Sequence, residues 1–405
     1  MFNVEEIRKD FPILSTKIYG KPLIYLDSGA TAQKPQCVID RVNYLHSSLN
    51  ANIHRGVHYI SEEATALYEA SRERIRCFIA AEQREEIIFT AGATASINLV
   101  AYSWGNKFLE AGDNIVVSEM EHHSNLVPWQ SVAESRGAQV RMLPIDNEGR
   151  LRYELLSELI DSHTKMVAVT QASNTLGTRP DLKPLIAAAH AVGAKVLVDG
   201  CQGVVHGGVD VKALDCDFYA FSGHKLYGPT GIGVLYGKRE VLDSMPPFLY
   251  GGDMVDRVSF AKTTYAPLPL KFEAGTSNFI GAIALADAIE YIEQFDVEDV
   301  EAHESNLLRL ATEGLSRIEG LRIYGTDSSK SAIISFNVEG IHHLDLGMIL
   351  DKLGIAIRTG MHCAEPTMQH FGVTGMCRAS FGMYNNEADV KALIGGVERA
   401  VAMLR

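Results

Sequence analysis

The feature that most constrains the fold is a regular alternation of short apolar runs and helical patterns between about residues 85 and 237. Runs rich in β-branched or aromatic residues are typical of buried strands, and they recur here at 86–90, 114–118, 165–170, 195–198, 218–221 and 231–236. Between them the sequence predicts helices, one over 94–104 and another that is capped by Asp181 and ends at Gly193. Apolar strands alternating with helices predict an α/β fold with a mostly parallel sheet covered on both faces.

After about residue 295 the sequence no longer shows this regular alternation of strands and helices. It predicts a long helix over 299–318, a strand over 331–336 and helices over 345–353 and 387–404. A chain of 405 residues is longer than the ~250–300 residues that one core usually serves. We therefore expect a large α/β domain over 21–296 and a smaller α+β domain over 297–405, which also takes in 1–20.

Composition excludes several classes of partner. With 37 Lys and Arg against 50 Asp and Glu, the net charge of −13 argues against nucleic acid or an anionic membrane as a partner. The charged first ten residues lack the apolar core of a signal peptide, and no run of ~18 apolar residues predicts a membrane span. The six cysteines include no C-x-x-C pair, so we expect no metal site and a reducing, cytoplasmic location.

Polar side chains follow five of the predicted strands. In open α/β sheets, ligands bind beyond the carboxyl ends of the strands. The candidates at these ends are Thr94, His122, Asn174, Asp199 and the segment 222–225, which contains Ser222, His224 and Lys225. Taken alone, such a residue is more often a cap, a turn residue or part of a solvated loop than a ligand. Their order along the sheet nevertheless predicts one shared crevice.

The spacing of an acid and a lysine within this set suits pyridoxal phosphate (PLP). This cofactor needs a lysine for its Schiff base and a carboxylate that keeps its pyridine nitrogen protonated. Asp199 ends one strand, and Lys225 follows a strand about 26 positions later. Thr94 opens a helix, whose free backbone N–H groups favour a phosphate. Ser222 and His224 add donors beside the lysine, and His122 is placed to stack on the ring.

At these residues the chain resembles the fold-type I PLP enzymes, and among them the class V aminotransferase-like branch. Within that branch it is most similar to the group II, SufS-type cysteine desulfurases of iron–sulfur cluster assembly. The motifs that carry the resemblance extend over nearly the whole chain, at 25–31, 54–56, 121–125, 198–203, 222–229, 272–276, 358–364 and 377–381.

The resemblance implies a role for each matching residue. Lys225 matches the Schiff-base lysine, Asp199 the partner of the pyridine nitrogen, and Gln202 the neighbour of the ring hydroxyl. His122 matches the histidine that stacks on the ring and handles protons. The implied phosphate ligands are Thr94, Ser222, His224 and, from the other subunit of a homodimer, Thr276. Asn174 and Arg358 match residues that orient the substrate carboxylate.

The implied reaction removes sulfur from free L-cysteine, giving alanine and a persulfide on Cys363. A SufE-like or SufU-like protein then collects the sulfur. Two departures stand out: the phosphate turn contains Ala93 and Ala95 where many relatives have a threonine and a glutamate, and Met361 replaces a common histidine.

Other activities share these residues. A kynureninase-like enzyme or an aminotransferase would use the same PLP site without a nucleophilic thiol, so Cys363 favours the desulfurase. Selenocysteine lysis is a nearer alternative, because selenium leaves more easily than sulfur. A sulfur-relay scaffold without turnover is a third, which Lys225 and Asp199 oppose. Cys363 itself could be a buried thiol, but it lies in a polar loop five residues after Arg358.

Overall fold

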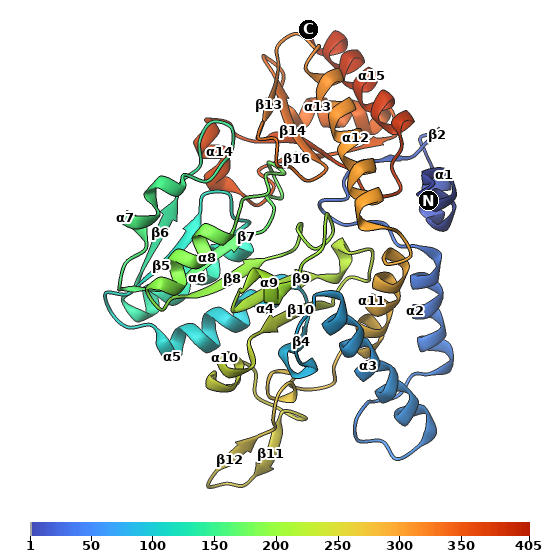
Figure 1. The fold of residues 1–405 in the computed structure, drawn as a ribbon. Coiled ribbons are helices and arrows are strands. Elements are labelled where there is room, and N and C mark those ends of the chain that lie inside the picture. Colours follow the sequence, from blue (N-terminus) through green and yellow to red (C-terminus); the bar gives the residue numbers. More distant parts are fainter. Residues whose placement is uncertain (1) are drawn as a thin grey trace.

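A seven-stranded sheet forms the centre of the computed structural model, which describes residues 2–405 (Figure 1). In spatial order its strands are β4 (Ile87–Thr90), β10 (Gly233–Gly237), β9 (Phe218–Ser222), β8 (Lys195–Asp199), β7 (Thr164–Thr170), β5 (Asn114–Ser118) and β6 (Gln139–Leu143). The neighbours from β9 to β6 pair in parallel, whereas β10 is antiparallel to both β4 and β9. The predicted mostly parallel sheet is confirmed.

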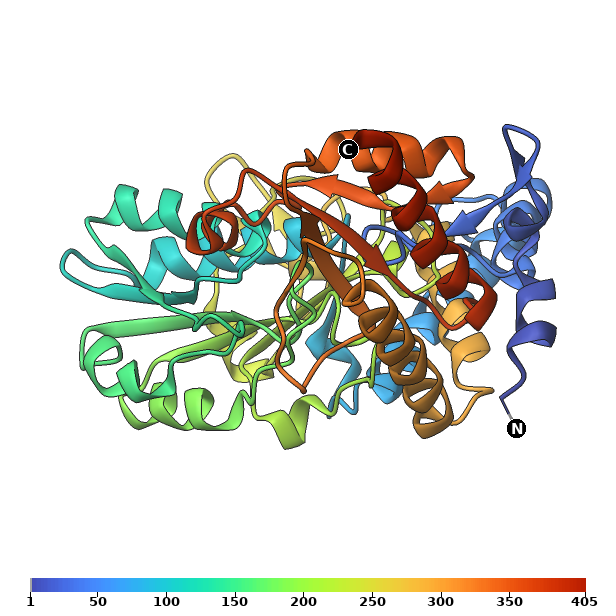
Figure 2. The same ribbon diagram turned by 90° about the horizontal axis from the view of Figure 1, so that it is seen from above.

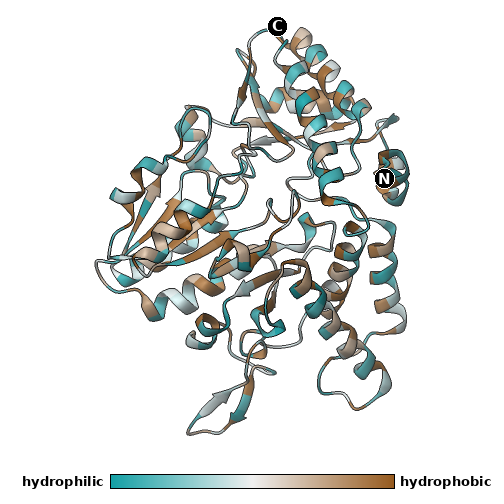
Figure 3. Cartoon of the chain, in the orientation of Figure 1, coloured by the Kyte–Doolittle hydropathy of each residue, from teal (hydrophilic) through white to brown (hydrophobic). Residues whose placement is uncertain are grey.

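Helices cover both faces of this sheet, and its strands are mostly hydrophobic in Figure 3, as expected for strands that are buried on both sides. In β8, Val196 and Val198 belong to one apolar cluster and Leu197 to the other. The first cluster contains residues of α3 (Tyr59–Phe78), α8 (Lys183–Ala191) and α11 (Phe279–Ile292), and the second contains residues of α4 (Ala93–Leu99) and α6 (Val127–Arg136).

The helix boundaries differ from the predictions in detail. The predicted helix 94–104 is α4 followed by a π-helical segment, Val100–Gly105. The prediction that Asp181 caps α8 was wrong by one residue, because Leu182 holds the N-cap position. The Asp181 carboxylate still accepts the Lys183 N–H at 3.1 Å, so it satisfies a free donor of the first turn from one residue further out.

A second, four-stranded sheet lies above the first (Figure 1). Its strands are, in order, β13 (Leu321–Tyr324), β14 (Ile333–Val338), β17 (Met376–Ser380) and β16 (Arg358–Gly360), and all pairs are antiparallel. The accompanying helices are α12 (Val297–Leu315), α13 (His343–Lys352) and α15 (Glu387–Leu404), and α12 and α15 pack side by side (Figure 2).

The N-terminal segment joins this upper part. Strand β3 (Ile24–Tyr25) pairs in parallel with β15 (Ile355–Ala356), and Arg8 Nη1 lies 2.8 Å from the carboxylate of Asp389 at the start of α15. Between residues 2 and 405, no helix combines the length and the apolar character needed to cross a membrane.

Candidate active site

Most of the predicted site residues surround one cavity of about 540 Å³. The predicted residues that line it are Thr94, His122, Asn174, Asp199, Ser222, His224, Lys225, Arg358 and Cys363. The lower sheet contributes the first seven, from the last residues of its strands or the segments that follow them, and the upper sheet contributes Arg358 and the loop that carries Cys363.

The carboxyl ends of β8 and β9 bring the acid and the lysine to the same edge of the sheet. Asp199 is the last residue of β8 and is 3% exposed. Its Oδ1 accepts the Cys201 N–H at 3.0 Å, which fixes the carboxylate. Lys225 lies in the 3₁₀ turn that follows β9. Since β8 and β9 are adjacent and parallel, both side chains reach the cavity.

The predicted phosphate donors come from two neighbouring turns. Ser222 ends β9, and its Oγ accepts the Ala93 N–H at 2.8 Å. This bond ties the start of α4, with Thr94, to the turn that carries His224 and Lys225. Burial, followed by the charges of Lys225 and Lys34, lowers the pKa of His224 to about 4, so the ring is neutral at pH 7.

His122 follows β5 and is also neutral. Burial and the nearby charge of Lys225 lower its pKa to about 4. Its Nδ1 accepts the N–H of Ser124 at 3.1 Å. The single ring proton therefore resides on Nε2.

The loop that carries Cys363 is a short turn between β16 and α14 (Glu365–Phe371). Cys363 is exposed and faces the same cavity as Lys225. Asn174 Nδ2 donates to the carbonyl of His362 at 2.8 Å, so in this structure Asn174 supports the loop. The backbone N–H of His123 donates to the carbonyl of Cys363 at 2.7 Å.

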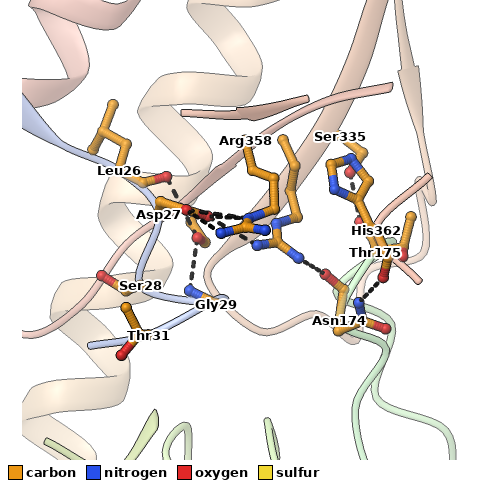
Figure 4. Close-up of polar contacts among 12 residues, drawn as sticks. Leu26, Asp27, Ser28, Gly29, Thr31, Asn174, Thr175, Ser335, Arg358 and His362 are labelled. Carbon is orange, nitrogen blue, oxygen red and sulfur yellow. Dashed lines mark hydrogen bonds and ion pairs between the residues drawn. The ribbon is translucent and has the colours of Figure 1, made fainter. Parts of the chain in front are cut away.

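Two arginines, Arg358 and Arg378, form the upper wall of the cavity, and Figure 4 shows the Arg358 side chain hydrogen-bonded to Asp27. Arg358 and Arg378 lie directly opposite each other in the pairing of β16 and β17. Asp27 lies between them: its Oδ2 is 3.0 Å from Arg358 Nη2, and its Oδ1 is 3.0 Å from Arg378 Nη2. These hydrogen bonds raise the pKa of Arg358, whereas burial lowers that of Arg378.

Sequence reasoning assigned no role to Arg378 or Asp27. The Arg378 side chain is 2% exposed, and its Nε is buried without a partner. One signal was available: a single charged residue stands in the otherwise uncharged run 376–381. Charged residues are almost never fully buried unless paired, so such a residue indicates a partner or a ligand.

Two predicted residues do not line the cavity within one chain. Gln202 is buried, and its Nε2 donates to the Gly29 carbonyl at 2.7 Å. Thr276 is exposed and borders a separate hollow of about 280 Å³, which Ala95 also lines.

The remaining thiols differ from Cys363. Cys201 borders the cavity, but burial raises its pKa to about 12. Burial raises the pKa of Cys377 to about 12 as well. Within residues 2–405, Cys363 is therefore the one exposed thiol at the cavity.

This fold and this set of residues are typical of PLP-dependent enzymes, and the similarity of the chain to known proteins indicates the same class. The chain belongs to the aminotransferase class-V family, whose model matches residues 24–393. Its three-dimensional fold is that of the fold-type I PLP transferases.

Particular relatives are similar over their whole length. A probable cysteine desulfurase of Vibrio cholerae serotype O1 is 48% identical over 404 residues, which is 100% of both chains. The crystal structure of the cysteine desulfurase CsdA from Escherichia coli has a TM-score of 0.94 and 43% identity, covering 100% of each chain. The apo structure of a cysteine desulfurase from Thermococcus onnurineus NA1 has a TM-score of 0.94 and 40% identity, covering 100% of this chain and 99% of that one.

Proposed function

We propose that this chain, which is a PLP-dependent cysteine desulfurase, binds its cofactor through Lys225 and accepts sulfur from L-cysteine on Cys363. One observation carries the proposal: Lys225, Asp199 and the exposed thiol of Cys363 border the same cavity. A kynureninase-like enzyme or an aminotransferase has no use for a thiol in that place.

The residues present fit PLP. The cavity volume of about 540 Å³ falls within the range of ~300–1,000 Å³ for small-molecule sites. The hydroxyls of Thr94 and Ser222 and the ring of His224 would hold the phosphate. The buried carboxylate of Asp199 would keep the pyridine nitrogen protonated, and Lys225 would hold the cofactor covalently. Gln202 carries from the resemblance the role of neighbour of the ring hydroxyl, and its amide is fixed by the Gly29 carbonyl.

When bound, PLP supplies an electron sink for charge released at the substrate α-carbon. The chain's own residues do the rest. The amine of Lys225 would take the α-proton, and His122, which lines the same cavity with its proton on Nε2, would pass a proton during turnover.

Arginines bind the substrate carboxylate. Arg358 and Asn174 carry this role from the resemblance, and the unpaired Nε of Arg378 supports adding Arg378. A guanidinium suits a carboxylate because its planar N–H groups can donate two parallel hydrogen bonds.

Cys363 then performs the sulfur transfer. Its thiolate attacks the substrate sulfur, an S–S bond forms, and the Cβ–S bond breaks with its electron pair left on carbon. Protonation of that carbon gives alanine, and the sulfur stays on Cys363 as a persulfide. The step needs no external oxidant or reductant.

The finer assignment is to the group II, SufS-type enzymes, which serve iron–sulfur cluster assembly. The short turn between β16 and α14 supports it, since group I members carry a longer cysteine loop. Such a turn keeps Cys363 close to the cavity, so a SufE-like or SufU-like acceptor would be needed to remove the sulfur. All six cysteines are free thiols, which supports a cytoplasmic location.

A homodimer would complete the site. Thr276 is exposed and does not line the cavity of its own chain, which suits a phosphate ligand lent to the partner. The hairpin of β11 (Val255–Val258) and β12 (Thr263–Tyr265) projects from the body (Figure 1). At its tip and base, Val258, Phe260 and Tyr250 are exposed, and such apolar patches favour burial against another chain.

The division into domains at residue 297 also stays a proposal. One apolar cluster takes nearly all its members from residues 307–401, which supports a separate small domain. Leu26 joins that cluster from the large-domain side of the boundary.

Replacement of the nucleophile tests the function. Cys363→Ala should still bind cysteine, seen as a change in the visible spectrum, but alanine release should fall at least a hundredfold and no labelled sulfur should remain on the protein. Cleavage of selenocysteine by this variant would indicate that selenium leaves without the thiol. If the variant releases alanine from cysteine at the normal rate, Cys363 is not the acceptor; the matched change Cys377→Ala would then show whether that thiol is.

A further inference from the structure

The turn that carries the thiol has a strained backbone. His362 and Cys363 are successive residues, and each has φ of +54°. Non-glycine residues rarely adopt the left-handed region, and two in a row persist only where the surroundings hold them. Something other than the turn itself must therefore keep Cys363 where it is.

Hydrogen bonds from other elements hold this turn on both sides. His362 is fixed by Asn174, which donates to its carbonyl, and by its own Nε2, 3.0 Å from the Met376 carbonyl. Cys363 is fixed by His123, whose backbone N–H donates to its carbonyl at 2.7 Å. The ring of His123 makes a second contact, because its Nε2 accepts the N–H of Glu365 at 3.2 Å.

The second contact replaces a missing helix cap. Glu365 is the first residue of α14, and the N-cap position is held by Ala364, which has no side-chain acceptor. The imidazole of His123 supplies the acceptor from outside the helix. To do so it must be neutral, with its proton on Nδ1.

His123 also lies next to a residue of the cofactor site. It follows His122 directly, in the short 3₁₀ segment His123–Asn125 after β5. One peptide bond thus connects a side chain at the cofactor site to the residue that holds the thiol turn.

We propose that His123 is a positioning residue for sulfur transfer. Its backbone N–H donates to the Cys363 carbonyl, and its Nε2 caps the helix that follows the turn. The proposal rests on Cys363 being the sulfur acceptor. Loss of the Nε2 acceptor lets the turn relax out of its strained conformation, so the thiol spends less time in line with the substrate sulfur.

Two variants of the holoenzyme separate the acceptor from the bulk of the ring. In His123→Gln, the side-chain oxygen reaches about as far as Nε2 and can still accept the Glu365 N–H. In His123→Phe, the ring volume is kept but the acceptor is lost. Both keep the backbone N–H that donates to Cys363. His163→Phe, on an exposed turn outside the cavity, is the matched control.

We expect persulfide formation in a single turnover to fall three- to tenfold in His123→Phe and to return within twofold of wild type in His123→Gln. The spectral change on cysteine binding should be unaltered in both. Amide hydrogen exchange in the peptide 361–368 and alkylation of Cys363 should accelerate several-fold in the Phe variant only.

The outcomes are distinct. Unchanged exchange in the Phe variant, or a Gln variant as impaired as the Phe variant, overturns the positioning role. The exchange measurement does not depend on sulfur chemistry. Faster exchange with normal persulfide formation would therefore show that His123 holds the turn but does not position the nucleophile. That result also overturns the proposal. Failure of the function itself would instead be seen as normal alanine release in Cys363→Ala.

Discussion

At the scale of single residues, the Asp27 carboxylate compensates the charges of the two arginines that line the cavity. Sheet pairing sets Arg358 directly opposite Arg378, and like charges in that position destabilise a sheet. Each guanidinium contacts the Asp27 carboxylate at 3.0 Å. With one anion between two cations, the wall keeps a net positive charge for a substrate carboxylate.

Removal of that anion should therefore cost stability. Asp27→Asn leaves the two arginines facing each other without compensation, and the Arg378 side chain is buried. We expect the free energy of unfolding to fall by about 1–3 kcal/mol, measured by urea denaturation. Arg358→Ala, in which the opposing charge is absent, is the matched background.

The double variant decides whether charge is the cause. If like-charge repulsion dominates, Asp27→Asn should cost less in the Arg358→Ala background than in the wild type. Equal costs in both backgrounds would mean that the Asp27 carboxylate acts only through its bond to Arg378.

At the scale of elements, imidazoles at the ends of three strands form part of the cavity wall. His122 follows β5, His224 follows β9, and His362 lies in the turn after β16. Burial is the first cause of a lowered pKa in each: about 4 for His122 and His224, and about 3 for His362. The folded chain keeps all three neutral where an unfolded chain would protonate them.

This difference in protonation makes the folded protein less stable at acidic pH. Between pH 6.5 and about 4 the unfolded state binds more protons, so stability is present above pH 6.5 and is lost as the pH falls. We expect the three histidines together to lower the free energy of unfolding by roughly 5 kcal/mol between pH 7 and pH 5, since each loses about 1.4 kcal/mol per pH unit below pH 6.5. His362→Gln, which can still donate to Met376, should remove about a third of that drop. The same slope in this variant would exclude His362 as a contributor.

The central sheet of the fold could be predicted from the sequence, whereas two contacts at the site could not. Apolar periodicity predicts the central strands, and parallel order then brings Asp199 and Lys225 to one edge of the sheet. Periodicity does not predict a role for Asp27, because a β-bridge to Ser380, far along the chain, is what brings Asp27 to the site. Nor does the periodicity predict the hydrogen bonds by which His123 holds the Cys363 turn. The strain of that turn is known only from its backbone angles.

At the scale of the whole molecule, the two sheets close over the site from opposite sides. The lower sheet supplies the residues proposed to hold the cofactor, and the upper sheet supplies the arginines and the thiol. Thr276 remains outside this cavity. In the proposed homodimer, Thr276 of a second chain would add a contact to the phosphate at this site.

Mixed dimers test whether Thr276 acts across the interface. Lys225→Ala cannot hold the cofactor covalently, and Thr276→Ala should weaken PLP binding roughly ten- to a hundredfold through the loss of one hydrogen bond to a charged group. If Thr276 serves the partner, a dimer of one chain of each kind has one site with an intact Lys225 and an intact Thr276. Co-expression with two different tags, followed by two affinity steps, isolates that species.

The mixed dimer should then bind PLP at half of its sites with wild-type affinity and recover up to half of the wild-type rate per dimer. If Thr276 serves its own chain, the only site with Lys225 still lacks its threonine, and PLP affinity stays at the level of the Thr276→Ala homodimer. The Thr94→Ala chain is the matched control, because Thr94 lines the cavity of its own chain. Paired with Lys225→Ala, it leaves no complete site, so no recovery is expected. A monomeric wild-type enzyme with full activity would contradict the interface altogether.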